Sequence, residues 1–309
     1  MSQEQAHSMF IARAIFLLFG AFALLGGSSR TLAGPPFQTD DPEPVELGHY
    51  EFYVFAASDG TPLETDPVGP AFEFNWGALP NTQLHAILSF GGIDPSNDPR
   101  YAPAGAGPGA YGLLDTELGV KYRFIMQSDS VPEVGVFPMV ELPSGSASRG
   151  LGVGRTWYKL PVWLQKDFGP WTTYGGGGYE IVNQVGYSNF RYAGWLLQRD
   201  RGDKWTLGAE LWYHGPQGAA TPQTHSSTMV DVGGYYYFRK PAFQLLFSIG
   251  RSAAGQSETY AYLGLYWTWG KQDADSGAHP VAWSRGARAP GGGLDAMSPQ
   301  ATSGCACNH

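Results

Sequence analysis

Apolar and polar residues alternate along most of the chain after residue 47, with a repeat of two residues. Segment 112–125 shows the pattern clearly. Its apolar face carries Leu114, Thr116, Leu118, Val120, Tyr122 and Phe124, and its other face carries Asp115, Glu117, Gly119, Lys121 and Arg123. Successive side chains of a β-strand point to opposite faces, so the alternation predicts strands with one apolar and one polar face.

The alternation predicts twelve strands, most of them about ten residues long or longer. They lie at residues 48–57, 70–79, 82–91, 112–125, 133–142, 154–166, 170–182, 190–200, 203–214, 227–239, 241–251 and 258–269. Pro138 and Pro161 fall inside two of these segments, although proline cannot donate a hydrogen bond to a neighbouring strand. The predicted class is therefore all-β, and an even number of strands is typical of bacterial membrane barrels.

The connections between the predicted strands alternate in length. The odd-numbered ones are longer, including the first, which starts at Ser58, and the segments 92–111 and 215–226. The even-numbered ones are tight turns, such as Pro80-Asn81 and Arg201-Gly202. We therefore expect a single-chain antiparallel transmembrane β-barrel of about 12 strands over residues 48–269, with long external loops and short periplasmic turns.

A soluble β-sandwich or lipocalin-like barrel would alternate in the same way, with its apolar face turned inward. Three features favour the membrane. The strands are long enough to cross a bilayer at a tilt. Aromatic residues gather near strand ends, as at interfaces with lipid headgroups, and the last segment, 258–269, has the aromatic character of a closing strand.

The first 33 residues have the pattern of a secretory signal peptide. An apolar run from Ala14 to Leu25 follows Arg13, and Thr31-Leu32-Ala33 forms a small-residue cleavage context before Gly34. The run is short for a spanning helix, which needs about 20 residues. We predict export of the chain, and a short membrane anchor is the alternative.

Two segments lie outside the predicted barrel. Residues 34–47 carry prolines that prevent a regular element, together with the carboxylates Asp40, Asp41, Glu43 and Glu46. Two interpretations of this lead-in stay open: it folds into the lumen, where its carboxylates meet interior Arg and Lys, or it is solvated. Residues 270–309 are rich in Gly, Ala, Ser and Pro without periodicity, and we expect a disordered C-terminal tail.

Composition narrows the chemistry. The formal charge is −8 and no Lys/Arg run occurs, so the sequence predicts no nucleic-acid partner. The two cysteines, Cys305 and Cys307, exclude a disulfide framework and a four-cysteine zinc site. His85 with Ser89, and His225 with Ser226, lack a nucleophile motif, so we predict that the protein is not an enzyme. We expect neither a cofactor nor a metal.

With the apolar faces towards lipid, the opposite faces line a lumen that mixes acids, bases and aromatic rings. The candidates for a solute path are Glu51, Glu117, Lys121, Arg123, Arg155, Lys159, Glu180, Trp195, Glu210, Asp231 and Tyr262. A charge-balanced, aromatic-lined passage would favour small, partly aromatic solutes. In the alternative interpretation the acids and bases pair and close a narrow interior. Twelve strands enclose less space than the 16–18 of open porins, so a wide pore is not expected.

The run from Pro35 to Glu51 resembles the opening motif of a family of predicted outer-membrane transporters. This family is related to the MetA-pathway barrels, named for the meta-cleavage route of phenol degradation. Leu142-Pro143-Ser144-Gly145, followed by Gly150-Leu151-Gly152, is similar to its mid-chain element. The resemblance covers residues 34–269 and implies a barrel in a Gram-negative outer membrane that passes small aromatic or hydrophobic compounds.

The partners that follow are membrane lipid, a small-molecule solute and the outer-membrane assembly machinery. The 40-residue tail departs from proteins that end on their last strand. Two functions stay open. The first is a small-solute channel or transporter in the bacterial outer membrane. The second is a structural or adhesive barrel with a plugged lumen, whose external loops carry the function.

Overall fold

The computed structural model describes residues 35–96, 98, 109–218 and 224–270. The predicted signal peptide and nearly all of the predicted tail lie outside these residues. In the described part of the chain, no helix is long and apolar enough to cross a membrane.

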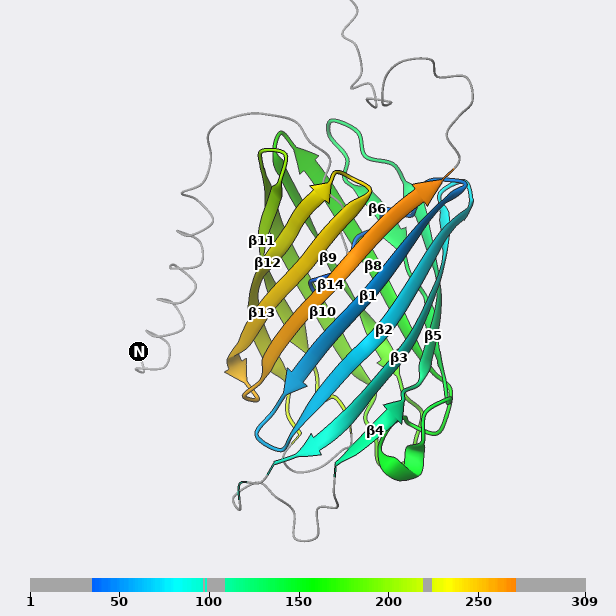
Figure 1. Cartoon of the computed structure of the whole chain (residues 1–309), viewed down its shortest axis with the longest axis vertical. Coiled ribbons are helices and arrows are strands. Elements are labelled where there is room, and N and C mark those ends of the chain that lie inside the picture. Colours follow the sequence, from blue (N-terminus) through cyan, green and yellow to red (C-terminus); the bar gives the residue numbers. More distant parts are fainter. Residues whose placement is uncertain (1–34, 97, 99–108, 219–223, 271–309) are drawn as a thin grey trace, which may run out of the picture. The chain divides into compact units, whose positions relative to one another are not determined.

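The described chain forms one antiparallel sheet of fourteen strand segments (Figure 1). They are β1 (His49–Gly60), β2 (Glu64–Leu79), β3 (Thr82–Pro95), β4 (Ala110–Leu113), β5 (Thr116–Ile125), β6 (Glu133–Val136), β7 (Met139–Leu142), β8 (Trp157–Phe168), β9 (Trp171–Ile181), β10 (Phe190–Arg201), β11 (Trp205–His214), β12 (Ser227–Arg239), β13 (Phe243–Gly255) and β14 (Thr259–Gly270). Strand β1 pairs with both β2 and β14, and β3 pairs with β5, so the sheet closes on itself. The long strands of the barrel are therefore paired on both sides, whereas the four-residue segment β4 pairs only with β3 among the described residues.

Two of the predicted strands are interrupted, so the barrel has twelve strands built from fourteen segments. Segments β4 and β5 are two parts of one strand, and β6 and β7 are two parts of another. The second break falls at Phe137-Pro138, because Pro138 has no N–H to donate. Pro161 stays within β8, where its carbonyl accepts a hydrogen bond of 3.3 Å from the Phe137 N–H.

Short and long connections lie at opposite ends of the barrel. Residues 80–81, 169–170 and 202–204 are tight turns at one end, and 143–156 and 215–226 are longer loops at the other. The prediction of a long first connection is wrong. It comprises residues 61–63, because the pairing of β1 with β2 continues outwards to Gly60↔Thr65 beyond an irregularity at Phe55/Ala57. Pro62 therefore lies in this turn, and Pro67 lies in the outer part of β2 rather than in a loop.

Most aliphatic side chains of the strands lie on the outer face, whereas the buried charged and amide side chains lie on the inner face. Leu263 is 57% exposed, whereas Glu210 on the inner face is 2% exposed. A soluble barrel has the reverse arrangement, because its apolar residues leave water by turning inward. The chain is therefore a transmembrane β-barrel whose apolar outer face meets lipid.

Aromatic residues form a girdle on the outer face at the end with the tight turns. Tyr50 stacks on Trp76 with 6.2 Å between ring centroids and on Trp269 with 5.8 Å. Phe243 stacks on Trp267 at 5.1 Å. Rings at this level suit the interface between hydrocarbon and headgroups. They place the periplasmic membrane surface near the start of β1 and the end of β14.

Candidate functional site

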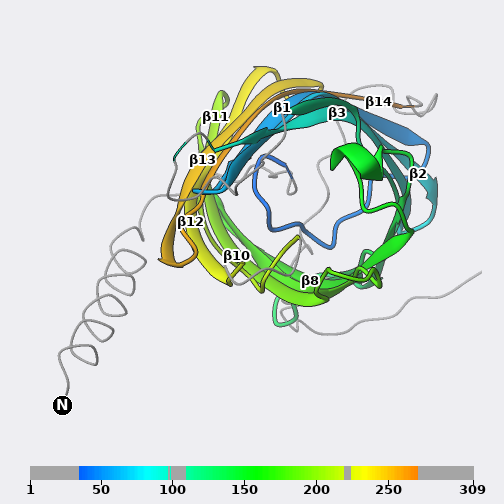
Figure 2. The same ribbon diagram turned by 90° about the horizontal axis from the view of Figure 1, so that it is seen from below.

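Residues 35–48, here called the lead-in segment, lie mostly inside the barrel (Figure 2), and only near their end, at Glu46 and Leu47, are two consecutive side chains exposed. Thr39 and Asp41 are almost completely buried, and Phe37 packs against Tyr174 and Leu196 of the wall. This placement decides between the two interpretations of the lead-in, since the segment occupies the lumen. Its prolines keep the backbone irregular, so its polar groups need partners from the wall.

The wall supplies those partners. The backbone N–H groups of Gln38 and Thr39 both donate to the Glu210 carboxylate, the first over 3.1 Å. Ser248 on β13 donates to the Pro36 carbonyl over 2.6 Å. On the opposite wall the Val45 N–H donates to Gln83 Oε1 over 3.0 Å. The segment thus spans the lumen from β11 and β13 to β3.

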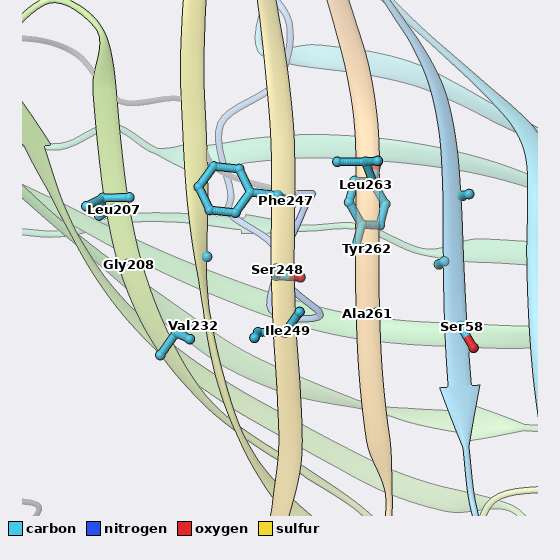
Figure 3. A pocket seen from close by; sticks show the side chains of 13 residues that line it. Ser58, Leu207, Gly208, Val232, Phe247, Ser248, Ile249, Ala261, Tyr262 and Leu263 are labelled. Atoms are coloured by element: carbon cyan, nitrogen blue, oxygen red, sulfur yellow. The ribbon is translucent and has the colours of Figure 1, made fainter.

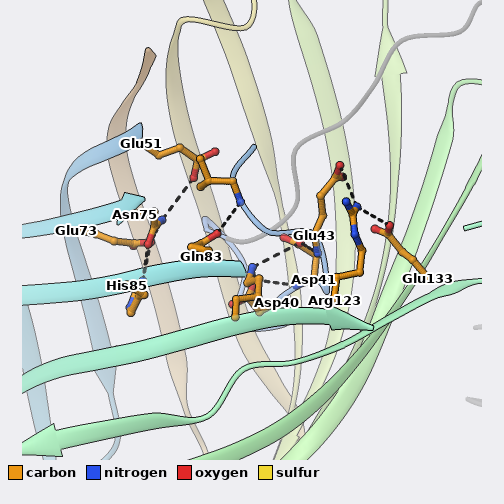
Figure 4. A network of polar contacts seen from close by, with 12 residues as sticks. Asp40, Asp41, Glu43, Glu51, Glu73, Asn75, Gln83, His85, Arg123 and Glu133 are labelled. Carbon is orange, nitrogen blue, oxygen red and sulfur yellow. Dashed lines mark hydrogen bonds and ion pairs between the residues drawn. The ribbon is translucent and has the colours of Figure 1, made fainter. Parts of the chain in front are cut away.

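Ion pairs also join the lead-in segment to the wall (Figure 4). Lys121 Nζ lies 2.9 Å from Asp40 Oδ1 and 3.5 Å from Asp41 Oδ1. Arg123 Nη1 lies 3.6 Å from Glu43 and 3.0 Å from Glu133 of β6. Three of the four lead-in carboxylates therefore meet interior bases.

The carboxyl group of Asp41 differs from an ordinary surface acid. Burial raises the pKa of this carboxyl well above its usual value. The Lys121 ammonium opposes part of the rise in pKa, and the neighbouring Asp40 and Glu43 add to it. The docked lead-in segment therefore holds a proton on Asp41 more tightly than a solvated segment would.

A second polar network lies on the wall around His85 (Figure 4). His85 Nδ1 is 2.6 Å from Asn75 Oδ1, and His85 Nε2 is 2.9 Å from Glu117 Oε1. The Asn75 amide nitrogen donates to Glu73 over 2.8 Å, which leaves its oxygen as the acceptor. Both ring nitrogens of His85 therefore face oxygen atoms, an arrangement in which a protonated imidazolium would donate to both.

Lys159 connects this network to β7. Its ammonium lies 2.6 Å from Glu117 Oε2 and 3.0 Å from Glu141 Oε1. Glu180 of β9 is the register partner of Lys159. The wall thus pairs the partly buried Lys159 with its own more deeply buried carboxylates, as buried charges require.

Aromatic side chains fill much of the remaining lumen wall in two clusters. The first consists of Tyr53, Tyr235, Tyr237, Leu246, Tyr262 and Tyr266. The second consists of Phe137, Trp163, Phe190, Tyr192, Trp212 and Met229. Within it, the rings of Tyr192 and Trp212 lie 5.4 Å apart. The interior combines charged networks with ring surfaces.

Most of the predicted solute-path residues lie on the lumen face. These are Glu51, Glu117, Lys121, Arg123, Lys159, Glu180, Glu210, Asp231 and Tyr262. Their role towards a solute stays a prediction.

Two placements were wrong. Trp195 lies on the outer face, 49% exposed, and its indole N–H donates to Thr173 Oγ1 over 2.9 Å. Both faces of β10 carry aromatic rings, so alternation alone does not distinguish them. Arg155 precedes β8 and is exposed in the loop 143–156, because the strand begins at Trp157 rather than at residue 154.

Sequence reasoning missed the neutral and histidine members of the networks. The sequence motifs point to His85 only as a neighbour of Ser89, and they indicate no role for Asn75 or Gln83. Each shares a strand face with a predicted acid or with another lumen residue, and that alternation was the available signal. His214 was also missed, although its Nε2 lies 2.8 Å from Glu258 Oε2. Across the described ranges, no group of three or more His, Cys, Asp or Glu side chains is placed to hold a metal ion.

A separate hollow of about 680 Å³ lies on the barrel wall across β11 to β14 and β1 (Figure 3). Its side chains include Leu207, Val232, Phe247, Ile249 and Leu263, which all alternate with lumen residues and therefore point outward. This hollow faces lipid and does not belong to the lumen.

Comparisons with known proteins agree with the fold. No family model matches the chain, and no curated protein matches it. A solved outer-membrane channel from Pseudomonas putida F1 is 17% identical, with a TM-score of 0.58 over 74% of this chain and 98% of that one. The KdgM porin in complex with disordered oligogalacturonate is 9% identical, with a TM-score of 0.44 over 70% of this chain and 99% of that one.

A third structure, the CymD monoaromatic hydrocarbon channel, is 10% identical, with a TM-score of 0.33 over 74% of this chain and 89% of that one. Of these three structures, the one from Pseudomonas putida F1 is similar enough to support an argument, and it supports the fold. The resemblance to the MetA-pathway transporters stays a prediction. A closed barrel with a lipid-facing apolar exterior is the architecture of the bacterial outer membrane, and this chain is a barrel of that membrane.

Proposed function

We propose that this protein is an outer-membrane channel for small solutes, closed by the lead-in segment and opened when that segment moves. The observation that carries the proposal is the way the segment is held. It crosses a polar lumen and is attached by hydrogen bonds and ion pairs, and it also buries Phe37, Val45 and the prolines Pro36, Pro42 and Pro44. Polar contacts of this kind exchange for contacts with water or solute at little net cost.

The passage favours small solutes with some aromatic character. A twelve-stranded barrel leaves a narrow interior once wall side chains are accommodated. The rings of Trp163, Tyr192 and Trp212 face that interior and provide apolar contact surfaces for a flat solute. Sugars of similar size would gain less binding free energy from contact with such a wall.

A second candidate is a structural or adhesive barrel whose external loops carry the function. The occupied lumen favours it, since Thr39, Tyr174 and Leu196 are fully buried where the lead-in segment meets the wall. In this case the segment would stabilise the barrel permanently and would not leave.

A reversible tether distinguishes the two candidates. A β-carbon placed on Gly135 of β6 would lie 3.0 Å from the Cβ of Pro42 in the lead-in segment, slightly less than the roughly 3.5–4.5 Å that a disulfide spans, so a small outward shift of the segment allows the bond. We would make Pro42→Cys with Gly135→Cys in a Cys305→Ser/Cys307→Ser background, with each single cysteine variant as a control. Liposome swelling and single-channel conductance would be measured before and after reduction.

A gated channel should be silent when oxidised and should regain conductance and solute uptake on reduction, while the single-cysteine controls respond to neither treatment. A folded barrel that stays silent after reduction, and in the untethered parent, would overturn the channel proposal and favour the second candidate.

A further inference from the structure

We propose that Lys121, assisted by Arg123 and Phe137, is a carboxylate-binding site on the solute path, which Asp40 of the lead-in segment occupies in the closed state. The solutes would be small aryl carboxylates, which replace the lead-in carboxylate as the segment leaves. This inference rests on the proposed channel function and adds its solute class.

The partners of Lys121 are the first argument. In the described part of the chain, both of its ion pairs are with lead-in residues, Asp40 and Asp41. Lys159, by contrast, is paired with Glu117 and Glu141 of the wall itself. The wall therefore supplies both ion-pair partners of Lys159, whereas the lead-in segment supplies those of Lys121, and Glu51 of the wall acts on Lys121 only from beyond ion-pair distance.

The burial of Lys121 is the second argument. Its side chain is 6% exposed beneath the lead-in segment. When the segment leaves, water reaches this ammonium, and among the described residues no wall carboxylate lies within ion-pair distance of it. A solute carboxylate can bind there only after Asp40 has left, so its binding promotes opening.

The surroundings of the ammonium select the rest of the solute. Lys121 Nζ lies 5.0 Å from the centroid of the Phe137 ring, which belongs to the aromatic cluster of the lumen. Arg123 lies two residues further along the same strand face and adds a second donor group. A carboxylate bound at Lys121 would therefore place an attached aromatic ring beside Phe137.

Three solutes of similar shape and different charge test the site. Uptake of benzoate, neutral benzamide and cationic benzylamine would be measured in liposomes that contain the full-length protein. We expect benzoate to enter about tenfold faster than benzamide, the ratio typical of one charge-assisted contact, with benzylamine slowest. Lys121→Met should abolish the preference, whereas Lys121→Arg should retain most of it.

The matched control is Lys166→Met. Lys166 donates to the carbonyls of Ser128 and Asp129 in the connection 126–132, so its loss should leave the preference unchanged. Asp40→Asn weakens the internal competitor, so it should raise benzoate uptake while Lys121 still selects the anion. Benzamide uptake as fast as benzoate uptake in both the parent and Asp40→Asn would overturn the carboxylate site.

A binding measurement covers the case in which Lys121→Met fails to fold. In the Asp40→Asn protein, benzoate should raise the thermal unfolding midpoint and benzamide should not. An equal response to both compounds would also overturn the site. Failure of the channel proposal gives a different result from failure of the carboxylate site. In that case neither the parent, the reduced tethered variant nor Asp40→Asn would pass any of the three compounds.

Discussion

Gly77 of β2 and Glu46 of the lead-in segment are in direct backbone contact. A β-carbon on Gly77 would lie 1.9 Å from the Glu46 carbonyl oxygen and 2.6 Å from that of Val45. The Gly77 carbonyl also accepts a hydrogen bond of 2.8 Å from the Gly48 N–H. The absence of a side chain at this position therefore allows the base of the lead-in segment to lie against the wall.

Gly77→Ala should loosen the lead-in segment and leave the barrel folded. Its nearest neighbours are all lead-in backbone atoms, so the added methyl group collides with the segment rather than with the wall. We expect a severalfold rise in solute uptake, with the folded band on unheated gels unchanged. Gly264→Ala is the control, because the nearest atoms to that inward glycine are wall atoms of Tyr262 and Phe55. An unchanged uptake in Gly77→Ala would show that this contact does not hold the gate closed.

Lys159→Met should destabilise the barrel by about 3–5 kcal/mol, the usual cost of removing one partner from a buried ion pair. The substitution leaves Glu117 and Glu141 close together without their shared cation. Unfolding by urea in lipid vesicles, followed by tryptophan fluorescence, measures the change in unfolding free energy. Adding Glu141→Gln should recover part of the loss, and Lys166→Met should stay within about 0.5 kcal/mol of the parent. A loss as small as that of the control would contradict a buried network.

Two tryptophans on opposite faces should differ in their effect on transport. Trp195 points to lipid, so Trp195→Phe should leave solute uptake unchanged. Trp212 faces the lumen beside Tyr192, so Trp212→Phe should change uptake of aromatic compounds relative to sugars. Liposome swelling with both solute types measures this difference. An effect at Trp195 equal to that at Trp212 would show that the lumen rings do not act on the solute.

Acidification should favour the closed state. The Asp41 carboxyl faces Lys121 from β5 and Asp40 and Glu43 of its own segment, and burial raises its pKa in the docked state. Docking therefore takes up a proton. The equilibrium constant for docking of the lead-in segment is largest below the ordinary carboxyl pKa of about 3.9. It falls by up to about tenfold per pH unit as the pH rises from there through the raised pKa of Asp41.

Single-channel open probability, recorded from acidic to neutral pH, measures this linkage. Asp41→Asn, which carries no titrating proton at that position, should show a flatter pH dependence than the parent. The same slope in both proteins would assign the pH response to another group.

The period-two alternation was sufficient to predict the fold class, because a strand alternates whatever its neighbours are. The twelve strands, their order and the short turns at one end all follow from local pattern and turn residues. Alternation also placed Glu117, Lys121 and Lys159 on the lumen face. It failed at Trp195, because both faces of β10 carry rings, and at Arg155, because a strand end depends on pairing partners that a local pattern does not contain.

The tertiary structure decided what the interior residues contact. The sequence of the lead-in segment allowed a solvated or an enclosed position with equal ease, since its prolines exclude regular structure in either place. Only barrel closure brings Glu210, Ser248 and Gln83 round the segment to satisfy its backbone, and only closure places Lys121 beside Asp40 while Lys159 meets Glu117. Pairing of charges across distant strands depends on strand register and barrel closure, which a one-dimensional pattern does not specify.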